Sequence, residues 1–124
     1  NTAKFPLIFR HAYSSGGGAN GYDSAVSVAV ADGGTANVTL TTVGDPTTGA
    51  PGCTGGTFTS TRTITGSFIF YQGLTTDSGI GASPPGCFWG GMTITSDVPI
   101  IAIADATNDL NVGDNDGLYN AFGN

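Results

Sequence analysis

The sequence is poor in charge and contains no glutamate. Charged residues make up 10% of its 124 residues, Lys4 is the single lysine, and all nine acidic residues are aspartates. Because Glu and Lys are strong helix formers, their scarcity argues against a helical protein. The formal net charge is −6 and the three basic residues form no patch. This balance excludes a protein that binds nucleic acid or is drawn to anionic membranes.

Long apolar runs and an initiator methionine are also missing. No apolar stretch is long enough to cross a bilayer as a helix. The chain begins with Asn1 and carries no signal-like segment. We therefore expect a mature product whose leader was removed, although an excised fragment would look the same. At 124 residues, the chain has the length of one domain and can bury one core.

A single histidine leaves little room for catalysis. His11 follows Arg10 at the end of an apolar segment, and no nucleophile motif accompanies it. We expect a surface or interface histidine, no cofactor and no enzymatic activity.

Only two cysteines are present, and each ends the tripeptide PGC. Cys53 and Cys87 lack the second CxxC or His pair of a zinc site, and they lie too far apart for a redox motif. A disulfide between them would close a loop of 34 residues (87 − 53), which stabilises a fold by about 3–4 kcal/mol in the loop-entropy account. A disulfide would also place the protein outside the cytosol. Two buried free thiols are the alternative.

What the chain has in abundance is Thr, Val, Ile and aromatic residues, together with 21 glycines. This composition is typical of all-β proteins. Alternating segments separated by turn signals predict about seven short strands and hence a two-sheet β-sandwich, with a single closed sheet as the structural alternative. The expected strands cover residues 5–9, 22–31, 36–43, 57–65, 67–72, 88–96 and 98–105, and Gly90-Gly91 suggests a bulge or a close backbone approach.

Threonine occupies every second position from Thr57 to Thr65. On a strand, these five side chains share one face. The simpler interpretation is a solvent-facing threonine ladder on an outer sheet. The functional alternative is a face for glycans or for flat ligands such as sugar lattices or ice.

Several motifs together resemble the Ig-like β-sandwich repeat domain of large secreted bacterial surface proteins. They are PLIFR, GYDSAVSVAVAD, GTANVTL, GGMTITSDVPIIAIA and GDNDGLYNAF, in that order. The resemblance covers nearly the whole chain and implies an Ig-like sandwich in a structural surface module without catalytic residues. The chain departs from the repeats in its longer loops after His11 and around the cysteines. It also has one copy where the family usually has several in tandem.

The single copy suggests another route to an array. Residues 1–21 divide into an apolar strand (Phe5, Pro6, Leu7, Ile8, Phe9) and a Gly-rich hinge, and residues 22–124 form the sandwich body with an Asp/Asn-rich tail. If the strand left its own body, it could complete a neighbouring subunit, as in donor-strand complementation. The alternative is that it pairs within its own domain.

We therefore expect a secreted structural subunit of the cell surface, a homopolymer of identical subunits in an extracellular filament or surface layer. The alternative from another class is a monomeric carbohydrate-binding or adhesion module that uses Tyr22, Trp89 or Tyr119.

Two further site predictions concern calcium and glycans. Asp109, Asp114 and Asp116 resemble part of a calcium loop, but the closing Glu of an EF-hand is absent. A solvated tail of Asx turns is the alternative. Asn37-Val38-Thr39 is an N-glycosylation sequon whose asparagine should point outward. Exposed Thr and Ser could carry O-linked sugars, so glycans are a second class of partner.

Overall fold

The computed structural model describes residues 1–10, 22–44, 55–72, 88–107 and 117–120. These residues form eight strands: β1 (Thr2–Arg10), β2 (Asp23–Val30), β3 (Thr35–Gly44), β4 (Gly56–Thr65), β5 (Ser67–Tyr71), β6 (Phe88–Ser96), β7 (Ile100–Thr107) and β8 (Gly117–Asn120). Seven of the strands match the predicted ones to within a few residues. The eighth, β8, is not among the predicted strands, and it pairs antiparallel with β7.

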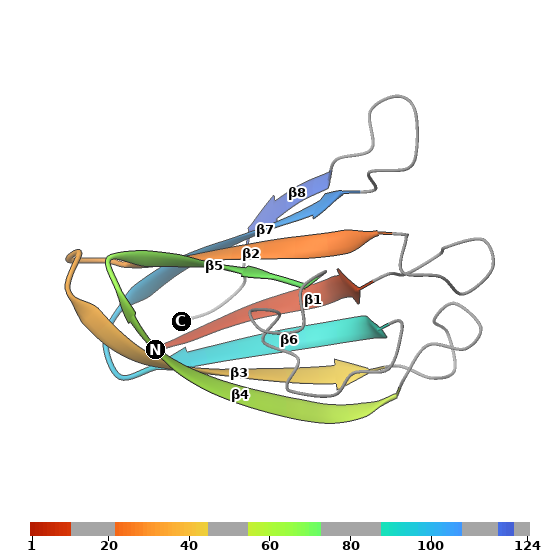
Figure 1. Cartoon of the computed structure of the whole chain (residues 1–124), viewed down its shortest axis with the longest axis horizontal. Coiled ribbons are helices and arrows are strands. Elements are labelled where there is room, and N and C mark those ends of the chain that lie inside the picture. Colours follow the sequence, from red (N-terminus) through yellow and green to blue (C-terminus); the bar gives the residue numbers. More distant parts are fainter. Residues whose placement is uncertain (11–21, 45–54, 73–87, 108–116, 121–124) are drawn as a thin grey trace.

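The strands form a β-sandwich of two four-stranded antiparallel sheets (Figure 1). The strand order is β1-β6-β3-β4 in the first sheet and β5-β2-β7-β8 in the second. The predicted all-β sandwich is therefore confirmed. Within the described part of the chain there is no helix that could cross a membrane.

The core lies between the two sheets and follows the period-two alternation of the strands. Val26, Val28 and Val30 of β2 point inward, and so do Val38 and Leu40 of β3. The other buried apolar side chains of this core are Ala3, Phe5, Ile8, Ala36, Ile64, Phe70, Met92, Ile94, Ala102 and Ala104.

Two glycine positions show why the chain turns where it does. Asp32 accepts a hydrogen bond from the Gly34 N–H at 2.8 Å in the turn between β2 and β3. Gly66, at φ 71°, is the single residue between β4 and β5, where the chain leaves the first sheet for the second. This left-handed φ favours glycine because a β-carbon would strain the backbone.

Candidate assembly site

The predicted assembly strand lies at one edge of the first sheet. β1 runs antiparallel to β6, from the pair Thr2 and Thr95 to the pair Arg10 and Phe88, and β6 is its only ladder neighbour among the described strands. β1 also contacts β2 and β7 of the opposite sheet. The strand therefore helps to close one side of the sandwich.

A bulge in β1 changes which residues point inward. Phe5 is opposite Met92 but Ile8 is opposite Gly90, so Pro6 and Leu7 share one position of β6. Before the bulge, odd-numbered residues are buried, and after it even-numbered residues are. Phe5 and Ile8 are both almost fully buried as a result. Of the five predicted assembly residues, these two enter the core, while Pro6 is exposed and Leu7 and Phe9 are partly exposed.

Two glycines of β6 lie close to the backbones of the neighbouring strands, one toward β3 and one toward β1. A β-carbon at Gly90 would overlap the carbonyl oxygen of Val43 on β3. At Gly91 it would lie 3.4 Å from the Phe5 carbonyl oxygen on β1. The predicted close backbone approach is thus confirmed at Gly90, and the register irregularity falls in β1 opposite Gly91.

Polar contacts tie both ends of β1 to its own chain. At the start, the backbone N–H of Ser96 donates to the carbonyl oxygen of Asn1 at 2.9 Å. At the end, the Phe9 N–H donates to Ser24 Oγ at 3.0 Å, which links β1 to the opposite sheet.

Arg10 is a buried cation that sequence reasoning did not single out. Its residue exposure is 4%, and its Nε and Nη1 atoms make no hydrogen bond to the described residues. Burial lowers the pKa of Arg10, and the negative charge of Asp23 partly opposes that effect. Asp23 is itself buried, at the start of β2. The end of β1 therefore places the positive charge of Arg10 near the negative charge of Asp23 inside the sandwich.

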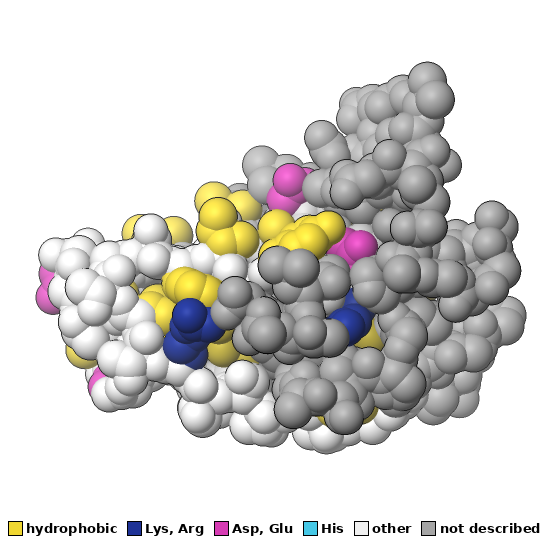
Figure 2. Space-filling view, in the orientation of Figure 1, with side chains coloured by type: hydrophobic (Ala, Val, Ile, Leu, Met, Phe, Trp, Pro, Cys, Tyr) yellow, Lys and Arg dark blue, Asp and Glu magenta, His cyan; other side chains and the backbone are white. Residues whose placement is uncertain are grey.

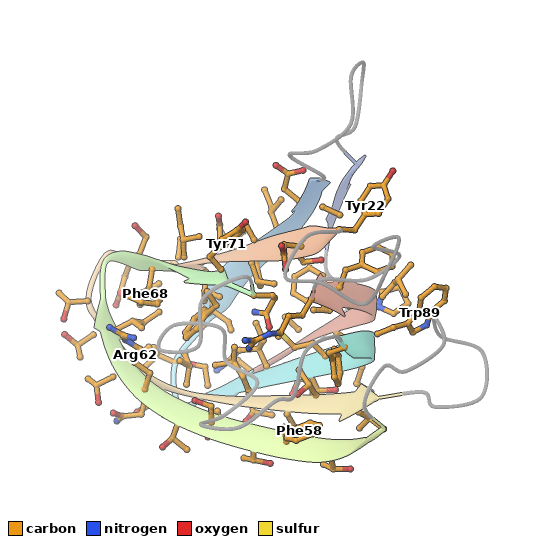
Figure 3. The ribbon with its side chains drawn as sticks, turned by 45° about the vertical axis from the view of Figure 1, so that its right-hand side comes forward. Tyr22, Phe58, Arg62, Phe68, Tyr71 and Trp89 are labelled. Atoms are coloured by element: carbon orange, nitrogen blue, oxygen red, sulfur yellow. The ribbon has the colours of Figure 1, made fainter. Side chains whose placement is uncertain are left out.

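Aromatic side chains gather beside the same end of β1 (Figure 3). The ring centroid of Phe9 lies 5.9 Å from that of Tyr22 and 5.6 Å from that of Trp89. Tyr22 and Trp89, two of the three predicted glycan-contacting aromatics, thus both pack against Phe9, and both are partly exposed. The side chain of Tyr119 lies outside the described residues.

The predicted threonine face is present on β4 and extends over the neighbouring strands. Thr57, Thr59, Thr61, Thr63 and Thr65 are all exposed. The backbone register places Thr39 and Thr95 in one row with Thr61, and Thr41 and Thr93 in one row with Thr59. The outer surface of the first sheet is therefore largely uncharged and hydroxylated.

The sequon asparagine lies on this face and is hydrogen-bonded at both side-chain atoms. Asn37 is exposed, as predicted. Its Nδ2 donates to Asp97 Oδ2 at 2.8 Å, and its Oδ1 accepts from Thr63 at 2.8 Å. The Asn37 backbone N–H also donates to Asp97 Oδ1 at 2.8 Å. The two bonds that Asp97 accepts lower its pKa.

The outer face of the second sheet exposes three isoleucines. Ile69, Ile101 and Ile103 are 57%, 62% and 38% exposed. Hydrophobic side chains are visible on this side of the molecule in Figure 2.

Several predicted sites lie outside the described residues. They are the Gly-rich hinge, His11, the proposed disulfide partners Cys53 and Cys87, and the candidate calcium ligands Asp109, Asp114 and Asp116. Among the residues that the structure does describe, no cluster of three His, Cys, Asp or Glu side chains could hold a metal ion.

No family model and no curated protein matches this chain. Among solved structures, the chain is similar to the crystal structure of Thermotoga maritima 1070, with a TM-score of 0.63 and 12% sequence identity. The similarity covers 98% of this chain and 91% of that one. At this identity the likeness shows a shared fold.

Proposed function

We propose that this chain is a secreted structural subunit that assembles into an extracellular filament or surface layer by exchanging β1. The observation that supports this best is the position of β1. It is an edge strand with a single ladder neighbour among the described strands, yet it buries Phe5 and Ile8 in the core. Such a strand can be replaced by the same segment of a neighbouring subunit without changing any other ladder.

Exchange would give β1 the same surroundings in the neighbouring subunit that it has in its own. A strand that buries several hundred Å² of apolar surface contributes on the order of 10 kcal/mol before entropy costs. Because the donated strand would make this contribution in either chain, subunit concentration and the connecting segment decide between the two arrangements. A head-to-tail exchange that does not close on itself produces an open filament.

The sequence between β1 and β2 suits such an exchange by composition. Residues 11–21 include four glycines and two serines. Gly/Ser-rich sequences behave as extensible linkers with little preferred conformation. This composition would let β1 reach a neighbour.

Electron microscopy of the full-length protein, concentrated and then treated with warm detergent, tests this proposal. We expect uniform filaments that survive the detergent. A chain lacking residues 1–13 should form no filaments, and adding residues 1–13 as a separate peptide should restore a folded but monomeric particle. The matched control is Lys4→Ala, because Lys4 is exposed on β1 and its loss should leave assembly intact. Filaments formed by the truncated chain would show that another surface makes the joint.

A monomeric carbohydrate-binding or adhesion module is the second candidate. It is favoured by the grouping of Tyr22 and Trp89 around Phe9 (Figure 3), because aromatic side chains are suited to packing against ligand rings. This candidate predicts a soluble monomer that binds a glycan on an array, with binding lost in Trp89→Ala. Filaments without glycan affinity would exclude it.

A further inference from the structure

β4 is the most open sheet edge in the described part of the molecule. It is ten residues long, ends the first sheet and has β3 as its only ladder neighbour among the described strands. It contains no proline, no lysine and no register shift, and its one charged residue is the exposed Arg62. An edge strand presents unpaired N–H and C=O groups, and natural proteins usually block long edges because these groups can pair with another chain.

The other three edges carry such protection. β1 has Pro6, which lacks an N–H, together with the exposed Lys4 and a bulge. β5 has five residues and β8 has four. Proline, lysine, bulges and short length are the devices that prevent edge pairing. β4 therefore differs from every other edge of the described sandwich.

We propose that β4 pairs edge to edge with β4 of a second copy of this chain, antiparallel and centred on Thr61. A two-fold axis at that position places Thr61 opposite the partner's Thr61. It also places Thr59 opposite the partner's Thr63, and Thr57 opposite the partner's Thr65. Each exposed threonine of the face then meets another threonine, and Thr–Thr pairs are among the cross-strand pairs that stabilise antiparallel sheets.

The opposite side of the strand matches as well. In the same register, Phe58 lies opposite the partner's Ile64 and Ser60 opposite the partner's Arg62, so the two copies of Arg62 are diagonal neighbours and are not directly opposed. Within its own chain, the Arg62 guanidinium lies 3.7 Å from the ring centroid of Phe68 on β5. This contact holds the positive charge of Arg62 close to the second sheet of its own molecule (Figure 3). The self-complementary pattern is the reason to expect a second copy as the occupant.

This pairing is independent of β1 exchange, because the two use opposite edges of the first sheet. It would join two four-stranded sheets into one of eight strands, with the threonine face continuous across the join. An isologous contact of this kind closes after two copies and does not propagate.

A charge-swap pair at the two-fold position tests the proposal in the full-length chain. Residue 61 faces its own copy, and directly opposed side chains on an antiparallel pair have β-carbons about 4.5–5.5 Å apart. Thr61→Lys alone and Thr61→Asp alone should each disrupt the pair by like-charge repulsion. Sedimentation velocity should then give half of the wild-type particle mass for each variant. An equimolar mixture of the two variants should recover the wild-type mass as a mixed pair.

Thr95→Lys is the matched control, because it adds the same charge on the same face but on β6, two strands away from the edge. We expect this variant to keep the wild-type mass. Circular dichroism should show all four proteins equally folded. Wild-type mass retained by Thr61→Lys, or a mixture that stays at half mass, would overturn the proposal. If β1 exchange yields filaments, the mass per unit length of the filaments replaces the particle mass in this comparison. Loss of the filaments then reports on β1 exchange, and a lower mass per unit length reports on loss of β4 pairing.

Discussion

At the scale of single residues, Gly90 shows how closely two strands approach. A β-carbon there would overlap the carbonyl oxygen of Val43, and backbone atoms cannot move away as a flexible side chain can. We expect Gly90→Ala to lower the free energy of unfolding by about 1–3 kcal/mol, as overpacking does in cores. Chemical denaturation measures this difference. Gly91→Ala is the control and should cost clearly less, because the nearest atom to its β-carbon would be 3.4 Å away.

Asp97 provides a prediction about pH. Its pKa is lowered in the folded state by hydrogen bonds from the Asn37 backbone N–H and side chain. A lowered pKa means that the stabilisation is fully present above the unfolded-state pKa and is lost as the pH falls through the folded one. Asp97→Asn should therefore be less stable than wild type at neutral pH, and the difference should shrink below about pH 4, where a free Asp titrates. Urea unfolding at several pH values measures it. A difference that does not change with pH would assign the effect to something other than the charge.

Arg10 illustrates a residue whose placement the sequence does not reveal. A charged residue at the end of an apolar strand is expected at the surface, since arginine is seldom fully buried. The bulge reverses the alternation in β1, and it is this reversal that turns Arg10 inward toward Asp23.

At the scale of elements, β1 contributes only a few side chains to the core between the sheets. Ile8 has no exposed surface, whereas Leu7 is partly exposed. We expect Ile8→Ala to lower the free energy of unfolding by about 2–5 kcal/mol, the usual range for a buried Ile to Ala change. Leu7→Ala should have a much smaller effect. Thermal or urea unfolding compares the two variants. Equal losses would mean that the bulge is not where the register places it.

The strands are largely predictable, because alternation and turn residues mark them locally. The threonine ladder, the inward valines of β2 and the turn at Asp32 all follow from patterns within a few residues. The order of strands in each sheet does not follow, because pairing depends on contacts between distant segments. β8 escapes prediction because four residues in a polar tail carry too little alternation, and its partner β7 supplies the pairing that defines it.

At the scale of the whole molecule, the negative net charge opposes the approach of two copies. The net charge is −6 and the isoelectric point is about 4.1. Repulsion between copies therefore weakens as the pH falls toward the isoelectric point. We expect self-association, measured by static light scattering at a fixed concentration, to rise as the pH is lowered from about 7 to about 4.5. Association that is unchanged over this range would mean that contacts between copies do not depend on net charge.

The outer faces of the two sheets give the molecule two unlike sides. One side is hydroxylated and nearly uncharged, and the other exposes Ile69, Ile101 and Ile103. In an array whose subunits all face the same way, one surface would be hydroxylated and the other would expose isoleucine side chains.

The bulge of β1 has a consequence for periodicity. A regular strand can slip by two residues and still bury the same face. β1 buries opposite parities before and after its bulge, and the bulge lies opposite Gly91 of β6, so a slip by two residues would move the bulge away from this glycine. The bulge thus favours a single register of β1 on β6. In a polymer joined by β1, every joint would then hold the donated strand in the same register, so the same number of residues would be left to connect each pair of subunits.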